Sequence, residues 1–105
     1  MKVPHKIVFT PESRGQIIAI QDYISQVATP DIARRFTDGI LAHLETLADY
    51  PLIGTARDDV RPGLRTLAHR RRVTMAFMVE ETAVVIIGFY YGGQNFETLL
   101  REDPS

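Results

Sequence analysis

The apolar positions in the first half of the chain predict a short strand followed by two amphipathic helices. Residues 6–9 (KIVF) are a strand candidate, and Thr10-Pro11 then supplies an N-cap residue and a proline suited to the first helical position. The first helix is expected from Pro11 to about Val27, because apolar side chains recur there at intervals of three and four. These side chains are Ile17, Ile20, Ile24 and Val27, with Ile18 and Tyr23 widening the stripe.

A second start signal, Thr29-Pro30, predicts a helix from Pro30 to about Ala48. Its apolar stripe consists of Ala33, Phe36, Ile40, Leu44 and Leu47. Since only Ala28 and Thr29 separate the helices, we expect them to form an antiparallel hairpin.

The second half of the chain reads as strands. Residues 55–62 are expected to be a polar loop, and three strand candidates follow at 64–69, 73–79 and 83–91. The last of them is apolar almost throughout, which is typical of a central strand buried on both faces. A short C-terminal helix is expected at 96–101, with Asn95 as its N-cap.

The predicted order is therefore β-α-α-β-β-β with a short C-terminal helix. This is an α+β fold in which the N-terminal helical hairpin packs on one face of an antiparallel sheet. Because the last strand is apolar on both sides, the other face should need a cover of its own. The C-terminal segment, a second copy or a partner chain could supply it.

Length and composition narrow the class of protein. The 105 residues suit a single domain, 1–105, and the absence of cysteine excludes disulfides and thiolate metal sites. The longest apolar run has nine residues, against about 20 for a membrane-spanning helix. We expect a soluble, cytoplasmic protein without membrane contact, and its net charge of −1 argues against direct nucleic-acid binding.

Cationic residues are concentrated in one short segment. Residues 57–72 hold half of the basic residues, all of them arginines, against two aspartates. Because a guanidinium binds carboxylates and phosphates through paired hydrogen bonds, we predict a surface that docks an acidic peptide or phosphates. The residues assigned to it are Arg61, Arg65, Arg70, Arg71 and Arg72. The competing interpretation is solvated charge at hairpin turns and sheet edges.

Five short motifs, in order along nearly the whole chain, resemble the ParE branch of the ParE/RelE toxin superfamily. They are residues 8–12 (VFTPE), 22–24 (DYI), 47–54 (LADYPLIG), 61–65 (RPGLR) and the closing strand with its following segment, 84–100.

The resemblance implies a RelE/ParE-like fold and the toxin of a type II toxin–antitoxin module. ParE-like toxins poison DNA gyrase by binding it and cut nothing themselves. Their ParD-type antitoxin is typically a ribbon-helix-helix dimer whose tail folds over the toxin. The implied assembly is a hetero-oligomer that touches DNA only through the antitoxin.

The alternative implied by the superfamily is a RelE-like, ribosome-dependent mRNA endonuclease. It would use Arg65, Arg71 or Arg72 on phosphate, with His69 or Tyr91 in proton transfer. Tyr91 stands where many ParE-like members have histidine, and an unshifted tyrosine, with a pKa of about 10, is a poor base. Tyr91 could equally close the edge of the core.

The other chemical candidates are weaker. His43 is expected on the surface, and HExxH, GxGxxG, Walker and GxSxG motifs are absent, so we expect no metal and no cofactor. The sequence favours a non-enzymatic toxin over the endonuclease. A copy that binds antitoxin but poisons nothing also remains open.

Overall fold

The computed structural model describes residues 3–92, and both helices in this range begin at the predicted caps. Helix α1 spans Pro11–Val27, and the Thr10 hydroxyl accepts the Ser13 N–H at 3.1 Å. Helix α2 spans Pro30–Asp49, and the Thr29 hydroxyl accepts the Ile32 N–H, also at 3.1 Å. Each cap satisfies a backbone donor that the first helical turn leaves unpaired.

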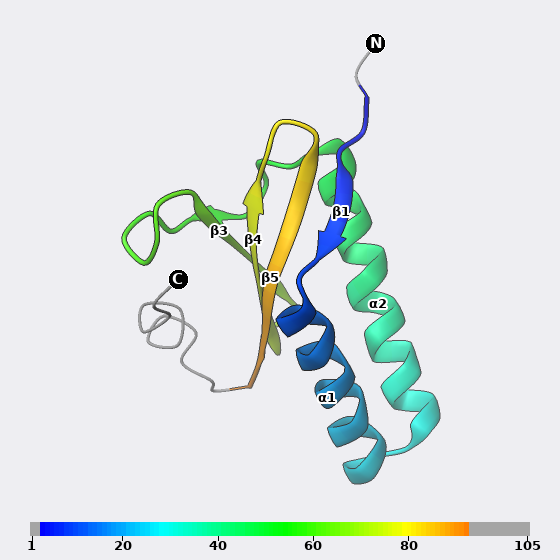
Figure 1. The fold of residues 1–105 in the computed structure, drawn as a ribbon. Helices are drawn as coiled ribbons and strands as arrows, with labels where there is room; N and C mark the ends of the chain where they lie inside the picture. The colour runs from blue at the N-terminus through cyan, green and yellow to red at the C-terminus, as the bar shows by residue number, and fades with distance from the viewer. Residues whose placement is uncertain (1–2, 93–105) are drawn as a thin grey trace.

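Within residues 3–92 the strands form one five-stranded sheet in the order β1-β5-β4-β3-β2. Their bounds are β1 Lys6–Phe9, β2 Thr55–Ala56, β3 Leu64–His69, β4 Val73–Val79 and β5 Ala83–Tyr91. The α+β class, the helical hairpin and the antiparallel pairing of the final strands are confirmed. Figure 1 shows α1 and α2 side by side on one side of the sheet.

Two details differ from the sequence prediction. Residues 55–62 were expected to be loop throughout, but Thr55 and Ala56 form β2, which pairs with Thr66 and Arg65 of β3. In addition, β1 lies parallel to β5, so the sheet is mixed (Figure 1). The predicted helix at 96–101 and its N-cap, Asn95, lie outside the described residues.

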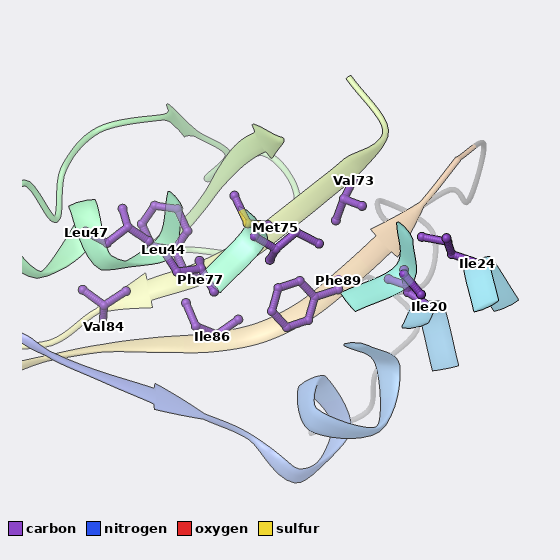
Figure 2. Close-up of a cluster of buried hydrophobic side chains, with 12 residues drawn as sticks. Ile20, Ile24, Leu44, Leu47, Val73, Met75, Phe77, Val84, Ile86 and Phe89 are labelled. Carbon is purple, nitrogen blue, oxygen red and sulfur yellow. The ribbon is translucent and has the colours of Figure 1, made fainter. Parts of the chain in front are cut away.

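The core lies between the helices and the sheet. It contains Ile20, Ile24, Ala33, Ile40, Leu44, Leu47, Val73, Met75, Phe77, Val84, Ile86 and Phe89. Figure 2 shows how side chains of α1 and α2 meet those of β4 and β5. A bulge between Ala76 and Phe77 shifts the register, so that Ile86 and Phe89 both contribute to this core.

The opposite face of the sheet is enclosed in part. Leu64, Ala76 and Tyr90 form a second buried cluster, with Val60 and Ile87 packed against it. The outer face is therefore covered at these three residues. The exposed large apolar side chains lie instead mainly on the helices and just after them, and include Ile18, Tyr23, Val27, Ile32, Leu41, Tyr50 and Leu52.

Candidate functional site

Three of the predicted binding residues, Arg70, Arg71 and Arg72, form the turn between β3 and β4. The Arg72 N–H donates to the His69 carbonyl at 3.0 Å and closes the turn. Arg70 and Arg71 have φ values of 51° and 59°, in the left-handed region that glycine and asparagine usually occupy. The turn thus holds three exposed arginines on a backbone that is unfavourable for two of them.

Arg65 lies in β3, on the sheet rather than in a turn. It is opposite Phe77 of β4, and its guanidinium donates to the carbonyl oxygens of Leu52 and Gly54. These contacts tie the segment after α2 to the sheet. Arg65 therefore has a structural role within the fold.

Arg61 belongs to the loop that precedes β3. In this loop Arg57 makes a two-point ion pair with Asp59, each contact 3.0 Å long. Arg61 and Arg65 lie near one end of β3. The turn formed by residues 70–72, which we call the arginine turn, lies at the other end. At about 3.3 Å per residue, Arg65 and Arg70 are about 17 Å apart along the strand direction. The five predicted arginines are therefore not gathered into one cluster.

A groove of about 470 Å³ joins the arginine turn to α2. We call it the arginine groove, and it is lined by Ile32, Arg35, Phe36, Arg70 and Arg72. Sequence reasoning missed the three lining residues from α2. Arg35 could be recognised only as a polar residue beside the apolar stripe, because its approach to the turn depends on tertiary packing.

The candidate acid–base residue His69 is enclosed at the end of β3. Its side chain is 6% exposed, and its Nδ1 lies 3.0 Å from Nδ1 of His43. His43, which was expected on the surface, is half-buried because of this contact. The other ring nitrogen of His69, Nε2, has no hydrogen-bond partner within the described residues and faces Gly39 of α2.

Burial lowers the pKa of His69 below its usual 6.5, and the nearby His43 and Arg70 lower it further. The imidazole is therefore held neutral near pH 7. Since one nitrogen is engaged by His43 and the other is buried against α2, neither is placed to take a proton from a substrate in solvent.

The candidate Tyr91 belongs to a chain of ring contacts across the sheet and helices. Its ring packs edge-on against Tyr23 at 5.9 Å and Phe36 at 6.1 Å between centroids. Phe36 also contacts His69 edge-on at 5.7 Å. Tyr91 thus bridges α1 and α2 at the end of β5, as expected for an aromatic residue that closes the core edge.

A second groove, of about 480 Å³, borders Tyr91. We call it the aromatic groove, and it is lined by Gln16, Ala19, Ile20, Tyr23, Phe89, Tyr91 and Gly92. Tyr23 is 52% exposed here, so the groove presents an apolar surface to solvent. Phe36 and Tyr91 are in contact, so one aromatic chain joins the two grooves.

Within residues 3–92, no three histidine, aspartate or glutamate side chains converge closely enough to hold a metal ion. Neither described helix is long and apolar enough to cross a membrane.

These features define a small α+β domain that presents two grooves suited to binding, one apolar and one cationic. A family profile described as "ParE toxin of type II toxin-antitoxin system, parDE" matches residues 7–96. The chain therefore belongs to the ParE toxin family, and it is a toxin of the type II class.

Among solved structures, the chain is similar to one titled "Chromosomal ParDE TA system from P. aeruginosa". The two share 21% sequence identity with a TM-score of 0.74, over 84% of this chain and 96% of the other. This likeness confirms the fold. A comparison with curated proteins finds no match.

Proposed function

We propose that this chain is a ParE toxin that acts in the cytoplasm by binding and inhibiting DNA gyrase. A ParD-type antitoxin of the ribbon-helix-helix class would hold it inactive in a hetero-oligomer. The observation that carries this proposal is the ParE family match over residues 7–96. The similarity to a structure titled as a ParDE system supports the antitoxin partner.

The geometry of the two acid–base candidates supports binding rather than RNA cleavage. A ribonuclease needs a group that reaches the 2′-hydroxyl and another that protonates the leaving oxygen. His69 is buried between His43 and Gly39, and Tyr91 packs between Tyr23 and Phe36. Packing within the fold accounts for the position of both side chains, and a toxin that acts by binding alone requires neither as an acid or a base.

The surface supports a polypeptide partner. The exposed apolar residues Tyr23, Val27 and Ile32 lie on α1, at its end and at the start of α2, and the arginine turn is near Ile32. In an antitoxin tail that carries acidic and apolar residues, the apolar side chains would cover the exposed apolar residues and the carboxylates would pair with the arginine turn. Of the predicted binding residues, we assign this role to Arg70, Arg71 and Arg72 first, and to Arg61 and Arg65 second.

The test combines purified toxin, gyrase and relaxed plasmid. We expect less supercoiled product as the toxin concentration rises, and recovery when the ribbon-helix-helix protein encoded beside the toxin is added. A parallel reaction contains translating ribosomes and a defined message. Unchanged supercoiling together with a cut message would contradict the proposal and establish the endonuclease.

A further inference from the structure

The arginine groove concentrates positive charge that the rest of the described chain does not neutralise. Arg35, Arg70 and Arg72 line it, and no acidic residue among residues 3–92 does. By contrast, Arg34, the neighbour of Arg35, pairs with Asp31 at 3.0 Å. Within residues 3–92 the three lining arginines take part in no ion pair, so their guanidinium groups remain available to an anion.

The remaining groove residues are apolar. Ile32 is 49% exposed, and Phe36 is a partly buried ring that contacts His69 and Tyr91. An inorganic anion or a nucleic-acid backbone would leave these two side chains without a matching group. A peptide that carries an apolar side chain beside carboxylates would match both parts of the surface.

The backbone of the arginine turn points to the same use. Arg70 and Arg71 occupy left-handed conformations, where Asn-Gly would fit with little strain. Unfavourable backbone conformations tend to persist where function requires the side chains that they carry. Arg70 lines the groove directly, and the turn also brings Arg72 to it.

We propose that the arginine groove binds an acidic peptide segment with one large apolar side chain. The apolar side chain would lie on Ile32 and Phe36, and carboxylates on either side of it would pair with Arg35, Arg70 and Arg72. The inference rests on the proposed function in one respect, because it takes the segment to be part of the antitoxin. It adds three residues of α2 to the binding surface and specifies the chemistry of the bound segment.

The chain offers a matched pair of variants for the test. Arg35→Gln with Arg72→Gln removes two charges from the groove. Arg14→Gln with Arg34→Gln removes the same charge from α1 and α2, at exposed positions that do not line the groove. The probe is a short fluorescent peptide with phenylalanine between glutamates, and binding to the whole chain is followed by fluorescence anisotropy at low salt.

We expect the groove variant to bind the peptide at least about tenfold more weakly and the matched control to stay within about twofold of the native chain. Replacing the phenylalanine of the peptide by alanine should also weaken binding. Equal losses in both variants would overturn the inference, since they would mean attraction by general charge alone.

Two other results would also overturn it. A single-stranded oligonucleotide of equal charge that binds more tightly than the peptide would assign the groove to nucleic acid. Self-association that only the groove variant abolishes would assign it to a second copy of the chain. The peptide assay contains neither gyrase nor antitoxin. Failure of the proposed gyrase activity would therefore leave a positive peptide result standing as support for the groove.

Discussion

The Nδ1 atoms of His43 and His69 lie 3.0 Å apart and join α2 to the end of β3. One of them donates its hydrogen and the other accepts it, so the contact requires at least one neutral ring. Burial keeps His69 neutral, and Arg70 of the adjacent turn adds to this effect. Protonation of His69 is therefore linked to its contact with His43 and to the charge of Arg70 in the adjacent turn.

This coupling predicts a stability that depends on pH. The pKa of His69 is lowered in the folded state, so the unfolded chain binds the proton more tightly and acid favours unfolding. The His69 contribution should be fully present above about pH 6.5 and lost as the pH falls through the lowered folded-state pKa. Urea titrations at a series of pH values measure it. His69→Phe should flatten the profile between about pH 7 and pH 5, and an unchanged profile in this variant would contradict the prediction.

Gly39 of α2 is predicted to be a site where alanine stabilises the fold. A Cβ there would lie 3.5 Å from Nε2 of His69, an ordinary van der Waals distance. Because glycine is unfavourable within a helix, Gly39→Ala should raise the free energy of unfolding by about 1 kcal/mol. A loss of stability in urea denaturation would show that the His69 side chain cannot tolerate the added carbon.

Gly54 should behave in the opposite way. Its φ is +87°, and a Cβ would collide with the Thr66 carbonyl oxygen of β3. Gly54→Ala should therefore lower the free energy of unfolding by about 2 kcal/mol, because both the backbone conformation and the space exclude a side chain. Denaturation under the conditions used for Gly39→Ala measures the difference, and two variants of equal stability would contradict this interpretation.

Substitutions in the arginine turn should stabilise the fold while removing side chains that are proposed to bind the antitoxin. Replacing Arg70-Arg71 by Asn-Gly places residues suited to left-handed backbone at the two strained positions. The free energy of unfolding should rise by about 1–2 kcal/mol. Thermal and urea denaturation measure the gain, and an unchanged or lower stability would mean that the side chains compensate for the strain within the fold.

Arg65 is predicted to matter for stability. Arg65→Ala removes the hydrogen bonds to the Leu52 and Gly54 carbonyls and should cost about 1–2 kcal/mol. Arg34→Ala, which breaks an exposed pair with Asp31, should change stability by less than about 1 kcal/mol. If Arg65→Ala were as stable as the native chain but weakened antitoxin binding, its main role would be at the interface.

The elements of the fold were accessible from sequence because their signals are local. Thr10-Pro11 and Thr29-Pro30 act through the next few residues, and the apolar run at 83–91 suffices to indicate a central strand. The two-residue strand β2 was not accessible, because it depends on pairing with β3 and has no pattern of its own. The parallel placement of β1 likewise depends on how the helical hairpin returns the chain to the sheet.

The site was less accessible than the fold because proximity in sequence is a poor guide to proximity in space. Arg65 and Arg70 are near each other in the chain but lie toward opposite ends of β3, while Arg35 of α2 reaches the same groove as Arg70. His43 and His69 are 26 residues apart and form a direct contact. The sequence shows an excess of arginine in one segment. It does not show that these arginines lie toward opposite ends of β3 in the folded chain.

The most direct test of the account is gyrase supercoiling with the native toxin beside the variants His69→Asn and Tyr91→Phe. If the toxin acts by binding, the native chain should inhibit supercoiling, and both variants, once shown to be folded, should inhibit it to a similar extent. If the native chain leaves gyrase unaffected but cleaves messages on translating ribosomes, and the variants lose that cleavage, the account is wrong.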